Sequence, residues 1–452
     1  MHKVPLRVAA TVSGLLLGAL VCCSSSNDGQ QRDRDAGFLT ADAEDSGEDD
    51  ATTHDAGADD ATAHDVGSDD AATHGSPDGG SRIAIGEWTD APGTCPAGTT
   101  RVDITSVVEM EDASRGDTHT EGTCFFVHDG LYVQRGSTLA LYLKRGGSVG
   151  SPVIWVGESR QGVIIRGRAT IEANDVTLSN MTFDLTGFSH SGAFNTVTVL
   201  GDRATISNVS LTGDCATGLR GGHIEISGGA ANSLVEACLV ERFGQCEGDG
   251  HLDHGIYLAG GHDITIRNNV IRENASRGIQ LNTEGGAYGT LASVIIERNR
   301  IYENGHRDYE DGVVLNGSGT GTIQNVIFRR NLFYRNYYSG IRFSGDAISQ
   351  ILVEENTFVD NGVPSNGPNR SEINLDDGLP EAIVRRNIFV VARTLVNTCT
   401  GSLAISDNLV QGDAQGSCVA NTVVADPEFS DSGADEYVPT SQAAAGYGAY
   451  AP

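Results

Sequence analysis

The sequence predicts an all-β protein: a single solenoid of parallel β-strands with a cap at each end, preceded by a disordered acidic tether. Two observations lead to this fold class. A short motif of alternating apolar residues that ends in asparagine recurs along most of the chain, and the repeats show no helical pattern. The segment before these repeats is acidic and of low complexity, and such a segment buries too little apolar surface to fold.

The first 23 residues have the features of an export signal. A basic start precedes an apolar run over residues 8–21, which is too short to remain in a membrane as a spanning helix. The run ends in Leu20-Val21-Cys22-Cys23, which resembles the lipid-attachment box of bacterial lipoproteins. The resemblance implies a lipid anchor at Cys23, with Cys22 as the alternative acceptor, and an outer-membrane lipoprotein of the cell envelope, either periplasmic or surface-exposed. An ordinary cleaved signal, and therefore a secreted protein, is the alternative.

Residues 24–81 form the predicted tether. They contain a tandem repeat in which Asp-Asp-Ala returns at Asp49, Asp59 and Asp69. Like charges keep such a segment extended and solvated. The whole chain has 60 acidic and 30 basic residues, a net charge of -30. Because a protein that binds phosphates needs a basic face, we exclude nucleic acid as a partner.

From about residue 150 onward, one unit repeats. Ile264-Thr265-Ile266-Arg267-Asn268-Asn269 returns as Val294-Ile295-Ile296-Glu297-Arg298-Asn299, with apolar residues at alternate positions as in a strand. Aligned on the asparagine, equivalent positions follow one another at steps of 21 to 32 residues: 180, 208, 238, 269, 299, 331, 356, 387 and 408. Repeats of this length are typical of a solenoid, in which equivalent residues of successive turns stack about 4.8 Å apart. We therefore expect a ladder of hydrogen-bonded asparagine amides along the axis.

A second stretch in each repeat has the form Gly-apolar-x-apolar, as in Gly255-Ile256-Tyr257-Leu258. A second asparagine often follows the first by five residues: Asn274, Asn304, Asn336 and Asn361. Together the two motifs resemble the right-handed parallel β-helix of the pectate-lyase-like superfamily. The resemblance and the general preference for right-handed crossovers imply a right-handed helix over residues 151–425. Because open sheet ends need covers, we assign residues 82–150 to an N-terminal cap and first coil, and residues 426–452 to a C-terminal cap.

Seven cysteines follow the predicted signal, at positions 95, 124, 215, 238, 246, 399 and 418. In an exported protein they favour disulfides. Their spacing predicts the pairs Cys95–Cys124 and Cys399–Cys418, with two of the other three paired and one free. Cys238 takes an asparagine position of the repeat and is therefore expected to be buried.

The outward face of the second strand is the expected place for chemistry. We take the following residues to point inward: Ile224, Ile256, Ile279, Val313, Ile341 and Ile373. The residue after each of them then points outward, which gives the series Glu225, Tyr257, Gln280, Val314, Arg342 and Asn374. A second series, two positions before each inward residue, contains His254, Arg277 and Asp311. We therefore predict a site in the middle coils, with catalytic residues His254, Tyr257, Arg277 and Asp311 and substrate-binding residues Glu225, Gln280, Arg307 and Arg342.

These side chains suit a uronic-acid polysaccharide. An arginine pairs with the sugar carboxylate and acidifies the neighbouring C5 proton, which a histidine or tyrosine can then remove. Asp253 or Asp311 would orient His254 and raise its pKa. The outcome is β-elimination by a lyase, or epimerisation if the proton returns on the other face. The chain has two lysines, Lys3 and Lys144, so the β-helix lyases that use a lysine base on a central coil are disfavoured.

Other functions stay open at the level of sequence. A non-catalytic β-helix that binds glycan or partners at the cell envelope explains the same residues, because one fold hosts many functions. Hydrolysis by paired carboxylates ranks third. The sequence identifies no definite cofactor, but acidic clusters at Glu310-Asp311 and at Glu372 with Asp376 and Asp377 could hold Ca²⁺. The expected partners are a polysaccharide and, through the lipid anchor, a membrane, and the protein is expected to be a monomer.

Overall fold

The computed structural model of the protein describes residues 85–451, apart from 117–118, 137–138, 188–194, 215–220, 245–251, 284–288, 307–309, 318–319, 363–369, 377–379, 401 and 413–416. The predicted signal, the lipid acceptor Cys23 and the tether lie outside the described residues. So do Cys215, Cys246, Arg307 and Asp377.

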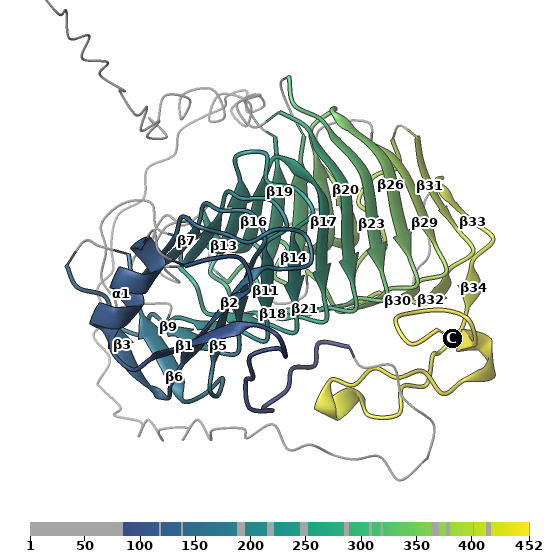
Figure 1. The fold of residues 1–452 in the computed structure, drawn as a ribbon. Helices are drawn as coiled ribbons and strands as arrows, with labels where there is room; N and C mark the ends of the chain where they lie inside the picture. The colour runs from purple at the N-terminus through teal and green to yellow at the C-terminus, as the bar shows by residue number, and fades with distance from the viewer. Residues whose placement is uncertain are drawn as a thin grey trace, which may run out of the picture. The chain divides into compact units, whose positions relative to one another are not determined.

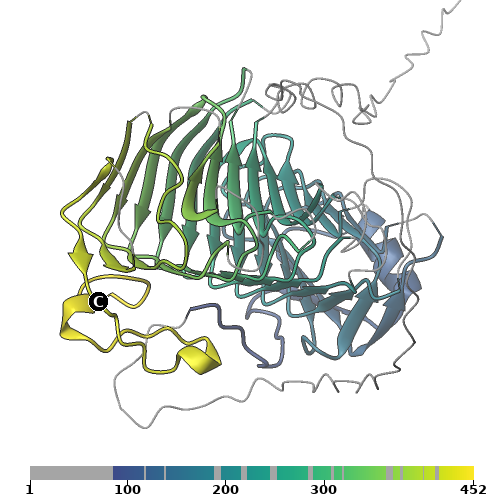
Figure 2. The same cartoon turned by 180° about the vertical axis from the view of Figure 1, so that it is seen from behind.

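The described strands form three parallel sheets, here named A, B and C. From β2 to β28, each turn of the chain contributes one strand to sheet A, then one to sheet B, then one to sheet C. Neighbours in a sheet therefore come from successive turns, and Figures 1 and 2 show these strands side by side along one axis. The predicted all-β parallel solenoid is confirmed.

Sheet A consists of β1 (Thr100–Ile104), β2 (Thr123–Val127), β5 (Val153–Gly157), β8 (Val176–Ser179), β11 (Thr205–Ser207), β14 (Leu234–Glu236), β17 (Gly261–Arg267), β20 (Leu291–Glu297), β23 (Ile323–Arg329), β26 (Ile348–Glu354), β29 (Glu381–Arg385), β31 (Ser402–Ser406) and β33 (Val419–Ala420). Sheet B consists of β3 (Gly130–Val133), β6 (Val163–Arg166), β9 (Thr182–Asp184), β12 (Ser210–Thr212), β15 (Leu239–Glu241), β18 (Val270–Arg272), β21 (Arg300–Tyr302), β24 (Leu332–Tyr334), β27 (Thr357–Val359), β30 (Ile388–Val390), β32 (Leu409–Gln411) and β34 (Val423–Val424). Sheet C consists of β4 (Leu141–Leu143), β7 (Ala169–Ile171), β10 (Val197–Val199), β13 (Gly221–Ser227), β16 (Asp253–Ala259), β19 (Ile279–Asn282), β22 (Val313–Asn316), β25 (Ser339–Ser344) and β28 (Ser371–Leu375).

The core is a stack of aliphatic and phenylalanine side chains that runs the length of the solenoid. Each strand places alternate residues inward, and equivalent residues of successive turns touch. The rings of Phe333, Phe358 and Phe389, for example, stack with centroids 4.7 and 4.8 Å apart. The predicted inward residues of sheet C are all buried: Ile224, Ile256, Ile279, Val313, Ile341 and Ile373.

Two asparagine ladders hold the turns in register. In the first, the Nδ2 of Asn269 donates to the Oδ1 of Asn299 at 2.9 Å, and the same bond repeats from Asn299 to Asn331 at 3.0 Å. It continues through Asn356 and Asn387 to Asn408. The second ladder joins Asn274, Asn304, Asn336 and Asn361. All are buried, so the amides satisfy one another where water cannot.

The alignment at the first two asparagines is wrong by one residue. Strand pairing places Ser207 beside Glu236, and Glu236 beside Arg267, so that Asn208 corresponds to Asn268 and not to Asn269. Asn180 and Asn208 have positive φ values of 57° and 50°, the turn conformation that asparagine tolerates. They therefore belong to the turn between sheets A and B, and the continuous ladder begins at Asn269.

The glycine of the second motif has a packing role. A Cβ on Gly278 would lie 2.6 Å from the carbonyl oxygen of Gly312 and 2.9 Å from the Nδ2 of Asn304. The glycines one turn before and one turn after, Gly255 and Gly312, are equally confined. A Cβ on either would lie within 2.8 Å of the carbonyl oxygen of the next glycine in the column and of the Nδ2 of a ladder asparagine. The glycine column and the second asparagine ladder thus occur together because the ladder fills the space that a side chain would take.

The N-terminal end of the core is covered by α1 (Val107–Arg115), which places Met110 against the core. Ser106 caps this helix by accepting a hydrogen bond from the backbone N–H of Glu109. Before it, residues 86–95 run along the turns between sheets A and B, where Thr89 exchanges hydrogen bonds with Asn208. The predicted disulfide Cys95–Cys124 ties this segment to β2 and is confirmed.

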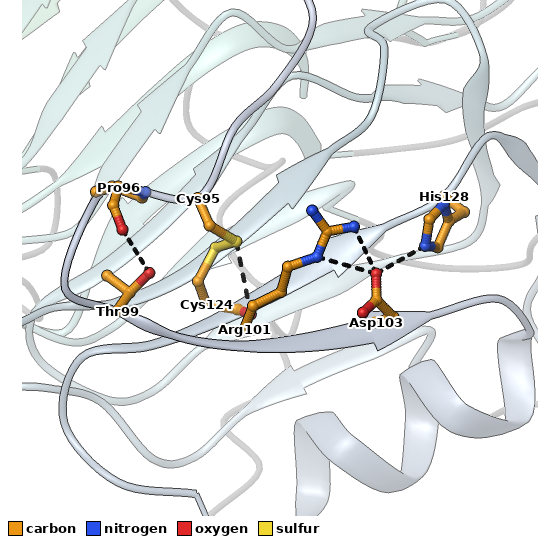
Figure 3. Close-up of a disulfide and its surroundings, with 7 residues drawn as sticks. All are labelled: Cys95, Pro96, Thr99, Arg101, Asp103, Cys124 and His128. Atoms are coloured by element: carbon orange, nitrogen blue, oxygen red, sulfur yellow. Dashed lines mark hydrogen bonds and ion pairs between the residues drawn. A yellow bond between two sulfur atoms is a disulfide. The ribbon is translucent and has the colours of Figure 1, made fainter.

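Figure 3 shows this disulfide, and beside it Arg101 and His128 both turned toward the carboxylate of Asp103. The guanidinium of Arg101 lies 2.6 Å and the Nε2 of His128 2.8 Å from Oδ1 of Asp103. Hydrogen bonds from these two residues lower the pKa of the Asp103 carboxyl. All three side chains are about one third to one half exposed, so this cluster is a surface network of β1 and β2.

The C-terminal residues 429–451, which include the short helices η2 (Ser432–Ala434) and η3 (Gln442–Ala444), pack beside sheet B. Tyr437 lies against Tyr334 of β24, and Asp435 forms an ion pair with Arg335 at 2.6 Å. The second predicted disulfide, Cys399–Cys418, is confirmed, and Cys238 is free and buried. Among the described residues, none of the helices has the length and apolar character needed to cross a membrane.

Candidate functional site

The outer face of sheet C carries the predicted outward series in register. Backbone pairing places Glu225 beside Tyr257, Tyr257 beside Gln280, Val314 beside Arg342, and Arg342 beside Asn374. Each residue is therefore about 4.8 Å from the next along the solenoid axis. This part of the prediction is confirmed: residues some 30 positions apart in the chain form one row.

The central feature is a carboxylate between two arginines. The Nη2 of Arg277 donates to Oε1 of Glu310 at 2.9 Å, and the Nη1 of Arg342 lies 3.7 Å from Oε2 of the same residue. Arg277 also donates from Nη1 to Oε1 of Gln280 at 3.2 Å, which holds its side chain along the sheet. We name Arg277, Glu310, Asp311 and Arg342 the arginine–carboxylate cluster.

Asp311 is the buried acid of this cluster. Its Oδ1 accepts a hydrogen bond from the hydroxyl of Ser339 on the next turn, and its Oδ2 lies 3.6 Å from Nη1 of Arg342. Burial raises the pKa of Asp311 to about 7, although Arg342 opposes this shift. The protonation of this carboxyl therefore changes near neutral pH, which is typical of functional sites but also occurs in structural networks.

Tyr257 and His254 lie on β16, at the N-terminal side of the cluster. The two rings stack with centroids 5.4 Å apart and an interplanar angle of 26°. The phenolic oxygen of Tyr257 accepts a hydrogen bond of 2.7 Å from Nδ2 of Asn282. Tyr257 is partly exposed, whereas His254 is buried, so the tyrosine is the member of this pair that a ligand can reach.

His254 is separated from Asp311 by one intervening turn. The backbone N–H of Gly255 bonds to Arg277, and that of Gly278 bonds to Asp311, which places Arg277 between the two. The hydrogen bond and ion pair described for Asp311 go to Ser339 and Arg342 instead. Asp311 therefore belongs to the arginines rather than to the histidine.

Glu225 lies one turn before Tyr257 and forms a hydrogen bond with the amide of Asn195. Burial raises the pKa of Glu225. Its neighbour His223 is a structural residue, because its ring is buried between Thr196 and the carbonyl oxygen of Glu241 and burial lowers its pKa to about 3. Arg307, the remaining predicted binding residue, lies outside the described residues.

Three further residues complete the site and were not predicted as part of it. Arg342 forms an ion pair with Asp376, and its guanidinium lies over the ring of Tyr338, 5.5 Å from the centroid. The guanidinium of Arg370 lies 5.1 Å from the same ring. The tyrosine thus separates two arginines, with its ring available to both charges.

The described residues do not form a Ca²⁺ site. Glu310 and Asp311 face the guanidinium groups of Arg277 and Arg342, and Glu372 accepts a hydrogen bond from Asn361 in the core. In the part of the chain that the structure describes, no group of three or more histidine, cysteine or acidic residues is placed to hold a metal ion. Carboxylates already paired with arginine are poor ligands for a hard cation.

Comparisons with known proteins support the fold. Residues 153–358 match a family model described as "Right handed beta helix region". No curated protein sequence matches the chain. Among solved structures, a pectate lyase (Pel9A) aligns with a TM-score of 0.51 and 14% identity over 76% of this chain and 86% of its own.

Two other solved structures are similar to a lesser degree. The alginate lyase AlyGC aligns with a TM-score of 0.43 and 13% identity over 77% of this chain and 56% of its own. The A-module of the mannuronan C-5 epimerase AlgE6 from Azotobacter vinelandii gives a TM-score of 0.45 and 15% identity over 71% of this chain and 96% of its own. At these identities the likeness concerns the fold and not the function. The chain is therefore a right-handed parallel β-helix.

Proposed function

We propose that this protein is a carbohydrate-active β-helix that acts as a lyase or epimerase on a uronic-acid polysaccharide, along the outer face of sheet C. The observation that carries the proposal is the arrangement of Arg277 and Arg342, which both turn toward one carboxylate, that of Glu310. Two guanidinium groups at this spacing suit a planar carboxylate, because each offers paired N–H donors. A uronic acid carries such a carboxylate on C5.

The two arginines supply the electrostatic part of the reaction. When they bind the sugar carboxylate, they stabilise the negative charge that develops as the C5 proton leaves. In β-elimination, the electron pair of the C5–H bond forms the C4–C5 double bond, and the C4–O bond breaks with protonation of the leaving oxygen. In epimerisation, a proton returns to C5 from the opposite face and the C4–O bond stays intact.

Tyr257 is the proposed proton-transfer residue. The hydrogen bond from Nδ2 of Asn282 holds its phenolic oxygen in place, and this oxygen is the atom that would exchange the proton. Tyr257 is partly exposed and lies one turn from Gln280, which is bonded to Arg277. His254 is a positioning residue in this scheme, because it stacks on Tyr257 and is itself buried.

The test is turnover of defined polymers. Polygalacturonate, polymannuronate and polyguluronate are incubated with the protein, and the conjugated double bond of an elimination product is followed by ultraviolet absorbance, while epimerisation is followed by proton NMR. The variant Tyr257→Phe should lower turnover by about 10²–10⁴-fold, as expected for loss of a proton-transfer group. Tyr142→Phe, on the same face at β4, is the matched control and should keep full activity. Absence of turnover on every polymer would reject the enzymatic proposal.

A non-catalytic glycan-binding module is the second candidate. It is favoured by the burial of Asp311 and by the pairing of both arginines with protein carboxylates. This alternative predicts binding of an acidic glycan without any product. Attachment through a lipid at Cys23 is a separate proposal for either function, and mass spectrometry of the mature N-terminus tests it.

A further inference from the structure

We propose that Glu310 is an internal occupant of the carboxylate seat formed by Arg277 and Arg342, and that an acidic sugar binds there only when the Glu310 side chain leaves. The inference rests on the proposed function for the identity of the ligand, and it concerns how access to the same site is controlled. It makes Glu310 a residue that limits affinity for acidic sugars.

The contacts of Glu310 match those expected of a bound carboxylate. Its two oxygens address different arginines, Oε1 at 2.9 Å from Arg277 and Oε2 at 3.7 Å from Arg342. These arginines come from different turns, so their common contact is made by a residue that the fold places between them. The contact with Arg277 is a charge-assisted hydrogen bond, which is stronger than one between neutral groups, and the contact with Arg342 is an ion pair.

Solvent can reach the arginines but hardly reaches the glutamate. The side chains of Arg277 and Arg342 are 15% and 21% exposed, whereas that of Glu310 is 6% exposed. A ligand that approaches from solvent therefore meets the guanidinium groups first. The carboxylate that it would replace lies on their protein side.

Charge balance favours exchange over addition. The neighbouring acidic partner of Arg342 is Asp376, and burial raises the pKa of Asp311 to about 7. Among the described residues of the cluster, Arg277 and Arg342 then face the carboxylates of Glu310 and Asp376 below that pH. A third carboxylate brought in by a sugar would be repelled, whereas a sugar that replaces Glu310 leaves the number of charges unchanged.

Glu310 lies outside the strands of the sheet. It precedes β22, and its side chain is buried but is not among the apolar residues of the main core cluster. Its backbone is held independently, because its carbonyl oxygen accepts from the N–H of Tyr338 at 2.9 Å.

The experiment measures binding rather than turnover. Tetragalacturonate and tetramannuronate are titrated into the full chain by calorimetry, with neutral cellotetraose as the uncharged probe. Glu310→Gln keeps the shape of the side chain and removes its charge, and it should bind at least one acidic tetramer about tenfold more tightly than wild type, the effect of losing one competing charged contact. Cellotetraose should be unaffected.

Glu297→Gln is the matched control, because Glu297 also pairs with an arginine, Arg329 at 2.6 Å, but on sheet A. It should bind like wild type. The side chain of Glu310→Asp is one methylene group shorter, so its carboxylate cannot reach both arginines. This variant should gain less affinity for the acidic tetramers than Glu310→Gln, and it replaces Glu310→Gln in the experiment if that variant does not fold. The double variant Glu310→Gln, Arg342→Gln should lose the gain, since the seat itself is then broken.

The outcomes separate this inference from the proposed function. If Glu310→Gln binds acidic tetramers no better than wild type, the inference is overturned even where wild type turns the polymer over. If the variant gains affinity for acidic tetramers but no polymer is ever converted, the inference about Glu310 is supported and the enzymatic proposal fails. Equal gains for cellotetraose would show that the shape of the site and not its charge had changed, and would also overturn the inference.

Discussion

Arg277 donates from Nη2 to Oε1 of Glu310 at 2.9 Å, although the two residues are 33 positions apart in the chain. The bond exists because the solenoid places the residue before β19 beside the residues before β22 on the next turn. Arg342, one further turn along, reaches the same carboxylate. Three successive turns thus contribute one charged side chain each to a single point.

Replacing either arginine should impair binding and turnover of an acidic polymer. Arg277→Gln and Arg342→Gln are each expected to lower kcat/KM by about 10²–10³-fold, because each removes charge stabilisation at the sugar carboxylate. The double variant should lose less than the product of the two effects, since both arginines act on one group. Steady-state kinetics on the active polymer measure this, with Arg329→Gln of sheet A as control. A fully multiplicative loss would mean that the arginines bind different sugars.

The periodic part of this site was predictable from sequence, and the rest was not. The row from Glu225 to Asn374 follows from the two-residue alternation of a strand, which fixes the direction of each side chain. Glu310, Tyr338 and Arg370 lie outside the strands, where no such alternation applies. The sequence drew attention to Glu310 only because it precedes Asp311. Nothing in the spacing of Tyr338 and Arg370 indicates that the ring of Tyr338 lies next to the guanidinium groups of both Arg342 and Arg370.

The asparagine ladder shows the same limit in a smaller way. The step between Asn269 and Asn299 predicts their contact, because both follow a strand of the same length. Asn208 instead occupies a turn position with a positive φ value, which asparagine tolerates. This position comes one residue before the ladder position of the repeat. One residue type thus served two purposes, and sequence alone did not separate them.

Asp311→Asn should alter the pH dependence of stability. Burial raises the pKa of Asp311 from its usual value to about 7, so the folded protein holds this proton more tightly than the unfolded chain does. Its contribution to stability is fully present below about pH 4 and is lost as pH rises through the raised pKa, near about 7. The asparagine variant lacks this loss and should therefore gain stability relative to wild type as pH rises.

Denaturant unfolding at several pH values between about 5 and 8 measures this difference. Asp346→Asn, in the turn after β25, is a control for loss of a negative charge. A variant that becomes less stable than wild type at higher pH would show that the ionised Asp311–Arg342 pair is favourable, contrary to the burial argument.

Gly278→Ala should destabilise the solenoid. The added Cβ would lie 2.6 Å from the carbonyl oxygen of Gly312 and 2.9 Å from the Nδ2 of Asn304. Both atoms are held by hydrogen bonds, so neither can make room without weakening its own bond. Overpacking of this kind costs roughly 1–3 kcal/mol, and the second ladder would be strained as well. Gly433→Ala is the matched control, because the nearest atom to its added Cβ is 3.9 Å away. Thermal unfolding of both variants compares them, and equal melting temperatures would contradict the packing role of the glycine column.

Glu372→Gln should stabilise the protein at neutral and alkaline pH. Glu372 is buried and ends the second ladder, since its Oε2 accepts a hydrogen bond of 2.7 Å from Nδ2 of Asn361. Burial raises the pKa of Glu372 well above its usual value, with Asp360 adding to the effect, so the folded state favours the protonated acid. The stability that this group contributes is present below about pH 4 and is lost as pH rises toward the raised pKa.

A glutamine keeps the oxygen that Asn361 needs and cannot ionise, so the ladder should end in the same way at every pH. The free energy of unfolding of Glu372→Gln should match that of wild type near about pH 4 and exceed it increasingly toward about pH 8. Glu381→Gln, on the exposed start of β29, controls for the loss of one charge. If Glu372→Gln is instead less stable at high pH, the buried carboxylate must be ionised and compensated by its surroundings, and the second ladder would then end in a charged group.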